Sequence, residues 1–152
     1  MGMFGMFGKK NSGIDPVTGE YGGDMVAMIK MLGSMPHMMR KPMMKGRINQ
    51  LLSLSEEKRQ ASVRDMIGAF NSPKVNNKTQ ESLVATRVEI LGELPEESRR
   101  TIISSRTQAL KTAPELDKAD QRVQERILPK VSQQAREAFL SSWESVRKEA
   151  YA

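Results

Sequence analysis

The chain has 152 residues, of which 38% are hydrophobic and 28% are charged, a composition typical of a globular protein with a core of its own. It contains no cysteine, which excludes disulfides, thiolate nucleophiles and cysteine-ligated zinc or iron–sulfur clusters. The formal net charge is +6, and residues 1–50 hold seven basic against three acidic residues. We therefore expect a partner that is apolar, acidic or both.

Methionine is distributed very unevenly along the chain. Eleven of the twelve methionines fall between Met1 and Met44, and only Met66 lies beyond them. Because methionine is unbranched, flexible and polarizable, a dense group of methionines suits a surface that adapts to another apolar surface. This pattern divides the chain into a methionine-rich docking arm, residues 1–44, and a helical body, residues 45–152.

The arm begins with two Gly-Met-Phe triplets between Gly2 and Phe7, whose closely spaced glycines predict an extended or irregular segment. Residues 11–23 are rich in turn formers and predict an ordered loop or linker. The apolar residues precede the first lysines, which is the reverse of a secretory signal. We therefore expect a cytoplasmic protein, or one that is peripheral on the cytoplasmic face of a membrane.

Asp24 can cap a helix over about residues 24–35, which Pro36 would end. This helix is apolar on nearly all sides but far shorter than the ~20 residues that span a bilayer. Between Pro36 and Arg47, methionine pairs alternate with basic pairs, and the two prolines Pro36 and Pro42 are expected to prevent one continuous helix. The pattern favours a contact surface whose methionines enter an apolar groove or a lipid boundary while basic groups reach acidic groups or phosphates.

The residues expected to contact a partner or a membrane are the apolar and basic side chains of the arm. They are Met3, Phe4, Met6, Phe7, Met25, Met28, Ile29, Met31, Leu32, Met35, Met38, Met39, Arg40, Lys41, Met43, Met44, Lys45 and Arg47. The alternative is that these methionines simply pack onto the helical body.

Beyond residue 45, one nine-residue pattern occurs three times. It covers residues 51–59 (LLSLSEEKR), 91–99 (LGELPEESR) and 128–136 (LPKVSQQAR), at spacings of 40 and 37 residues. Each copy follows a short basic and apolar helix and precedes a longer amphipathic one, which predicts three helix–turn–helix units. No segment alternates in the manner of a β-strand. The expected fold class is therefore all-α, either a short helical repeat or an irregular helical bundle.

Each copy of the pattern marks the start of a helix. Ser55 and Ser132 can cap free amides, and Pro95 fits the first helical position. The pairs Glu56-Glu57 and Glu96-Glu97 then lie in a first turn, where carboxylates complement the positive end of the helix dipole. We interpret these acidic pairs as caps and not as catalytic groups.

The chain offers one histidine, no cysteine and no phosphate-binding glycine loop. We therefore expect no enzyme, no cofactor, no metal and no small-molecule substrate. The preferred hypothesis is a non-catalytic accessory or scaffold subunit of a larger, membrane-associated protein complex, which it contacts through the arm.

Two other functions stay open. The arm holds soft donors suited to Cu(I), although the basic residues among them repel a cation; they are His37, Met35, Met38, Met39, Met43 and Met44. A basic, methionine-rich segment beside a helical body also resembles in composition the methionine-rich domain of signal recognition particle proteins, which implies binding of RNA or apolar peptides. The basic clusters contain no aromatic residue for stacking bases, so a nucleic-acid partner is not our expectation.

Overall fold

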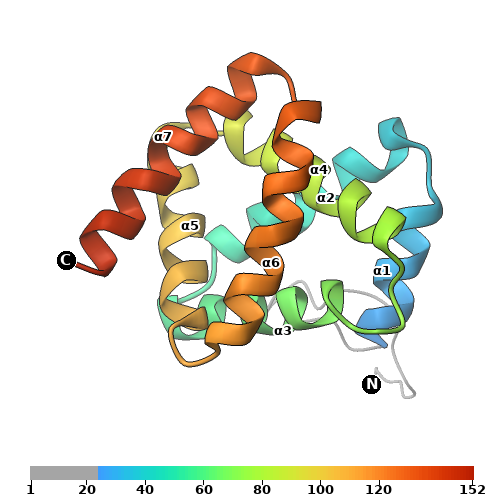
Figure 1. Cartoon of the computed structure of the whole chain (residues 1–152), viewed down its shortest axis with the longest axis horizontal. Helices are drawn as coiled ribbons and strands as arrows, with labels where there is room; N and C mark the ends of the chain where they lie inside the picture. The colour runs from blue at the N-terminus through green and yellow to red at the C-terminus, as the bar shows by residue number, and fades with distance from the viewer. Residues whose placement is uncertain (1–23) are drawn as a thin grey trace.

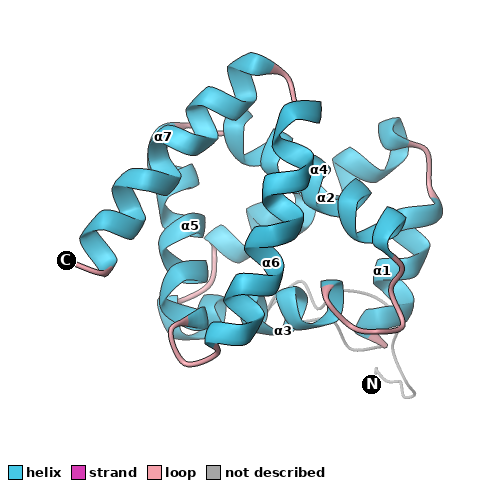
Figure 2. Cartoon of the chain, in the orientation of Figure 1, coloured by secondary structure: helices cyan, strands magenta, loops and turns pink. Residues whose placement is uncertain are grey.

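The computed structural model describes residues 24–152, and every regular element in this range is a helix (Figures 1 and 2). The all-α prediction is confirmed. The extended segment expected over residues 1–23, with Met3, Phe4, Met6 and Phe7, lies outside the described residues.

Seven α-helices and one 3₁₀ turn follow one another along the described residues. They are α1 (Met25–Ser34), α2 (His37–Leu52), α3 (Glu56–Phe70), α4 (Asn77–Glu93), α5 (Glu96–Leu110), α6 (Pro114–Ile127), η1 (Leu128–Lys130) and α7 (Gln133–Ala150). The three predicted helix–turn–helix units are α2 with α3, α4 with α5, and α6 with α7, and α1 precedes them. The predicted order of a short helix before a longer one holds only for α6 and α7, because α2 and α4 have 16 and 17 residues and α3 and α5 have 15 each.

Side-chain caps begin several of these helices. Asp24 caps α1 as predicted, because its Oδ1 accepts hydrogen bonds from the amides of Val26 and Ala27. Ser55 and Ser132 cap α3 and α7 in the same way. These starts are therefore set by residues next to the helix ends.

The prolines depart in part from the expectation. Pro36 separates α1 from α2, but the expected break at Pro42 does not occur, because α2 continues through it. Pro42 has no amide hydrogen for the carbonyl of Met38, four residues earlier. Met38 is 80% exposed, so water can bond that carbonyl instead. Pro95 is the N-cap of α5, one position before the first helical residue.

Each helix packs against the helices two and three positions further along the chain. Thus α1 contacts α3 and α4, α2 contacts α4 and α5, α3 contacts α5 and α6, α4 contacts α6 and α7, and α5 contacts α7. This order winds the helices into a compact spiral, which in Figure 1 runs from α1 at one side to α7 at the other. The spiral is the predicted helical repeat, with α1 added at its start.

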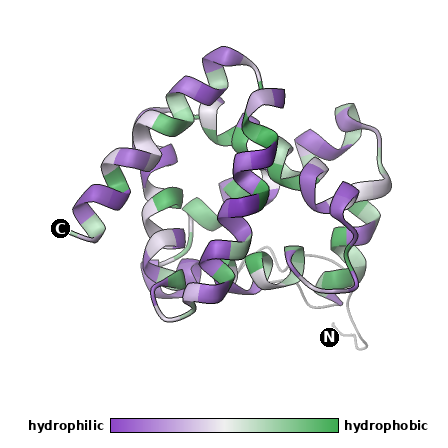
Figure 3. Ribbon diagram, in the orientation of Figure 1, coloured by the Kyte–Doolittle hydropathy of each residue, from purple (hydrophilic) through white to green (hydrophobic). Residues whose placement is uncertain are grey.

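One hydrophobic core runs through the spiral. Ile29 of α1, Met44 of α2, Phe70 of α3 and Phe139 of α7 all belong to it. Figure 3 shows hydrophobic and hydrophilic segments alternating along the helices, as expected for helices with one buried face. The expected domain boundary after residue 44 falls inside α2, so the helical part of the arm shares this core with the body. None of α1–α7 combines the length and the hydropathy needed to cross a membrane.

Candidate functional site: a methionine-lined cavity

An arginine follows each turn of the repeated pattern and bonds back to the end of the preceding helix. Nη1 of Arg59 donates to the carbonyls of Leu51 (3.2 Å) and Leu54 (2.7 Å). Arg99 and Arg136 bond the carbonyls before their own turns in the same way. Carbonyls at a helix C-terminus have no partner within the helix, and a cation there also complements the dipole. The arginines therefore close the turns.

A fourth arginine of this kind closes the turn between α1 and α2. Nη1 of Arg40 donates to the carbonyls of Met35 (2.9 Å) and Leu32 (3.5 Å), and its Nε donates to Oγ1 of Thr86 in α4 (3.2 Å). Arg40 is buried, so this residue of the expected docking group serves the fold. We call Arg40, Arg59, Arg99 and Arg136 the turn arginines.

Residues 32–40 (LGSMPHMMR) are therefore a fourth copy of the pattern, most similar to residues 91–99 (LGELPEESR). This copy was not recognised among the repeats within the sequence, because His37 and Met38 occupy the two positions that hold a Glu or Gln pair in the other copies. The signal that could have found it is the arginine that ends every copy, eight residues after its first leucine.

Two glycines at equivalent positions of the pattern allow helices to meet closely. A β-carbon on Gly92 would lie 2.3 Å from the carbonyl oxygen of Ala135, and one on Gly33 would lie 2.4 Å from Cγ2 of Thr79. These positions bring α4 against the start of α7, and α1 against the start of α4. Glycines and turn arginines together hold α1 and α2 on the rest of the spiral.

A cavity of about 210 Å³ lies inside the spiral and is lined by residues of all seven helices. Most of the lining side chains are apolar: Met28, Ile29, Met31, Leu32, Met43, Met44, Ile48, Leu51, Val63, Met66, Ile67, Phe70, Leu91, Ile102, Ile103, Phe139 and Trp143. The polar ones are Arg47, Arg87, Arg106 and Gln124. An apolar cavity of about 150 Å³ can hold a benzene molecule, so this cavity has room for one bulky apolar side chain.

The cavity reaches the surface between α1 and α2. Met31 and Met43 line it and are also 47% and 49% exposed. Met39, 54% exposed, lies four residues before Met43 and therefore on the same side of α2, with Met38 beside it. Within residues 24–152, the only other exposed large hydrophobic residue is Tyr151. The name methionine surface is used below for Met31, Met38, Met39 and Met43.

The other residues expected at the docking site lie in three environments. Ile29, Leu32, Arg40, Met44 and Arg47 are buried, Met25, Met28, Met35 and Lys41 are partly buried, and Lys45 is exposed. Nζ of Lys41 is 2.7 Å from Glu89 and 2.9 Å from Glu93, and the hydrogen bond to Glu89 raises the pKa of Lys41. The structure thus brings together only part of the expected group at the surface.

The soft donors considered for Cu(I) do not share one side of α2. Met44 is buried in the core, whereas Met38 is exposed. Nε2 of His37 is 3.2 Å from Oε1 of Glu89. Across residues 24–152, no group of three or more His, Cys, Asp or Glu side chains is arranged to hold a metal ion.

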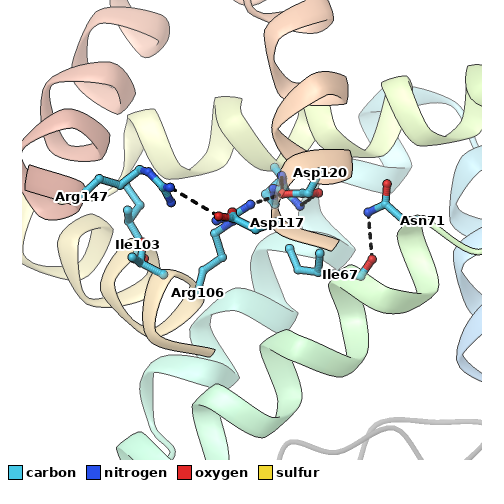
Figure 4. A network of polar contacts seen from close by, with 9 residues as sticks. Ile67, Asn71, Ile103, Arg106, Asp117, Asp120 and Arg147 are labelled. Carbon is cyan, nitrogen blue, oxygen red and sulfur yellow. Dashed lines mark hydrogen bonds and ion pairs between the residues drawn. The ribbon is translucent and has the colours of Figure 1, made fainter. Parts of the chain in front are cut away.

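Arginines and aspartates of α4 to α7 form a buried network next to the cavity (Figure 4). Nη1 of Arg106 is 2.7 Å from Oδ1 of Asp117, and its Nη2 is 2.9 Å from Oδ2 of Asp120. Arg87 also bonds Asp120 (2.9 Å), and Arg147 bonds Asp117 (3.4 Å). The network ties four helices together around α6.

Asp120 is the most deeply buried member of this network. Burial raises the pKa of its carboxyl, but the charges of Arg87 and Arg106 more than offset this and hold the pKa below its ordinary value. The Trp143 ring lies within cation–π distance of Arg106 and Arg147, 4.8 Å and 4.9 Å from their guanidinium carbons. Because Arg106 and Trp143 also line the cavity, the network fixes part of the cavity wall.

Comparison with models of known protein families, with characterised proteins and with solved structures found no match for this chain. The site has three distinctive features: an apolar cavity, four exposed methionines at and beside the cavity mouth, and a helical frame that holds both.

Proposed function

We propose that this protein is a non-catalytic accessory or scaffold subunit that binds an apolar helix of a partner protein at the methionine surface. The observation that carries the proposal is the cavity that opens between Met31 and Met43. An apolar hollow at the surface can accept an anchoring side chain, and methionines at its mouth can adapt to the shape of the anchor. Binding of an amphipathic helix in an apolar groove is a recurrent mode of recognition between proteins.

The chemistry of the site narrows the choice of helix. The cavity suits one bulky anchor such as Phe or Leu, and apolar residues one turn away on the helix would contact Met39 and Met38. Lys30 is exposed next to Met31 of α1, one of the two residues at the mouth, which favours a helix with an acidic residue beside its apolar face. In this proposal the assembly that carries the helix is attached to the cytoplasmic face of a membrane, since an apolar and basic surface suits that setting.

The proposal is tested with protein labelled with ¹³C at the methionine methyl groups. One synthetic peptide forms an amphipathic helix of Leu, Phe and Glu, and a second has the same composition scrambled so that no apolar face exists. The helical peptide alone should shift the methyl signals of Met31, Met38, Met39 and Met43. Combining Met31→Glu with Met43→Glu should weaken its binding about tenfold or more, because carboxylates at the mouth oppose both the anchor and the acidic flanks.

The matched control is Tyr151→Glu, which also replaces an exposed apolar side chain but lies at the end of α7. This variant should bind the peptide as the wild type does. Vesicles of neutral and of anionic phospholipid provide the second comparison. If vesicles shift the same signals and the peptide does not compete with them, or if the scrambled peptide binds equally well, a protein helix is not the ligand and the proposal is wrong.

A further inference from the structure

The helices α3, α5 and α7 are stacked through one repeated bond. Nε of Arg59 in α3 donates to Oγ of Ser105 in α5 (2.9 Å), and Nε of Arg99 in α5 donates to Oγ of Ser142 in α7 (2.8 Å). In both receiving helices the serine comes six residues after that helix's own turn arginine. The two contacts therefore have the same register.

On α7 the arginine that would donate this bond is present, but no described helix supplies an acceptor for it. Nη1 of Arg136 bonds the carbonyls of Leu128 and Val131, as in the other turns. Its Nε and Nη2 donate to no residue within 24–152, and the side chain is partly exposed. Lys148 is also exposed on α7 and, counted from the turn arginine, has the position that Lys111 has at the end of α5. No described helix covers the outer face of α7.

A second donor therefore recurs on α7. Nζ of Lys111 reaches across from the end of α5 and donates to the carbonyl of Ala150 in α7 (2.8 Å). Lys148 follows Arg136 by the same twelve residues that separate Lys111 from Arg99. Three side chains, Arg99, Arg100 and Lys111, donate from α5 and its end to α7. The outer face of α7 carries two of these donors, as Arg136 and Lys148, and has Glu137 in the place of Arg100.

The first helix of this stack presents the matching acceptor. Six residues after Arg59 stands Asp65, which is exposed and whose side chain has no bonding partner within 24–152. Ala61 and Gly68 lie on the same face of α3, and a β-carbon on Gly68 would meet nothing within 4 Å. A carboxylate accepts a guanidinium hydrogen bond more strongly than a serine hydroxyl does.

We propose that copies of this chain associate head to tail, with α3 of one copy stacked on α7 of the next. Arg136 then pairs with Asp65 of the neighbouring copy, in the register that Arg59 and Arg99 show within one chain. Such an interface joins two different faces, so it builds open chains or closed rings. Leu140 is the main apolar residue on the outer face of α7, and the rest of that face is polar. The association is therefore weak, reversible and sensitive to salt.

Sedimentation velocity of the full chain at low salt, over a range of concentrations, tests the proposal. The mean mass of the wild type should rise with concentration. Asp65→Arg and Arg136→Glu should each abolish this rise, because each places like charges at the interface. An equal mixture of the two variants should associate again, since the two introduced side chains meet at one interface and the native Arg136 and Asp65 meet at the other.

Glu125→Arg is the control for the change in charge, because Glu125 is exposed on α6, and it should associate as the wild type does. Arg136→Glu also removes a turn cap, so circular dichroism must show a native helix content before that variant is used. If Arg136→Glu does not fold, the test rests on two other variants. Asp65→Arg should lose the association and Glu125→Arg should keep it.

A wild type that stays monomeric at all concentrations, or one whose association survives Asp65→Arg, would overturn the proposal. The variant that combines Met31→Glu with Met43→Glu should still self-associate, because the methionine surface is not part of this interface. Failure here is therefore distinguishable from failure of the proposed function.

Discussion

Arg99 donates from Nε to Ser142 over 2.8 Å while its Nη1 bonds the carbonyl of Leu94, also over 2.8 Å. One buried side chain thus closes the turn between α4 and α5 and fixes α7 on α5. Arg40 and Arg59 combine the same two tasks, each toward a hydroxyl two helices further along the chain. The repeated pattern therefore encodes the order of packing as well as the turns.

Replacement of Arg99 by alanine should lower the free energy of unfolding by about 2–4 kcal/mol, because a buried hydroxyl and a helix-end carbonyl both lose their donor. Ser142→Ala should cost about 1–3 kcal/mol, since Nε of Arg99 is then buried without an acceptor. Urea unfolding followed by circular dichroism measures both. The control is Arg126→Ala, which breaks an exposed ion pair with Glu81 and should cost less than about 1 kcal/mol. Equal losses for Arg99 and Arg126 would contradict this role of the turn arginines.

Gly92→Ala should destabilise the protein by about 1–3 kcal/mol or more. The new β-carbon would meet backbone atoms of Ala135 at 2.3–2.8 Å, and backbone cannot rotate away, so α4 and α7 would have to separate. Gly68→Ala is the matched control. Its β-carbon would meet nothing within 4 Å, and it should stabilise α3 by about 0.5–1 kcal/mol because alanine is the better helix former. Thermal unfolding of both variants decides the matter, and a stable Gly92→Ala protein would show that the helices are not in close contact here.

The features that the sequence predicted correctly are local ones. Asp24, Ser55 and Ser132 begin helices, and Pro36 ends one, because a cap or a missing amide acts on atoms within a single turn. Their effect does not depend on what packs against the helix, so single-sequence reasoning was sufficient.

The buried face of α2 could also have been found from the sequence. Arg40, Met44, Arg47, Ile48 and Leu51 recur at helical period and are all buried. The assumption that Pro42 ends a helix concealed this period and assigned all the methionines of the segment to one contact surface. In the structure some of these methionines are buried and others are exposed. Met44 is buried, whereas its neighbour Met43 is exposed.

The cavity wall, in contrast, depends on contacts that no local pattern indicates. Asp120 is 33 residues from Arg87 and 14 from Arg106 in sequence, and only the packing of α6 on α4 and α5 brings the three together. In the sequence, Asp120 is a polar residue at helical spacing among the apolar Leu116, Val123 and Ile127, and nothing there indicates its partners. A buried charge network of this kind needs the fold before it can be recognised.

Asp120 should make the protein sensitive to acid. Because the pKa of this carboxyl is lowered in the folded state, its contribution to stability is complete above the ordinary value of about 3.9 and is lost as the pH falls through the folded-state value. Asp120→Asn should lower the free energy of unfolding at pH 7 by about 3–5 kcal/mol, since Arg87 and Arg106 lose their shared counter-charge.

Urea unfolding at a series of pH values measures this effect. The difference between wild type and Asp120→Asn should be constant near neutral pH and should shrink below about pH 4, as the wild-type carboxyl takes up its proton. Glu125→Gln, an exposed change on the same helix, should leave the wild-type pH profile unaltered. A constant difference down to the most acidic pH would mean that Asp120 acts through packing alone.

Truncation of a buried methionine should mainly reduce stability, and truncation of an exposed one should mainly reduce peptide binding. Met44→Ala should lower the free energy of unfolding by about 2–5 kcal/mol, because Met44 is 6% exposed and belongs to the core. Met38→Ala should change it by no more than about 0.5 kcal/mol. Both changes lie in α2, so the helix propensity of alanine affects them equally.

Peptide binding should show the reverse order, with the loss in Met38→Ala. Because Met44 lines the cavity, a small apolar solute such as benzene should restore more stability in Met44→Ala, where the space is enlarged, than in Met38→Ala, whose cavity is that of the wild type.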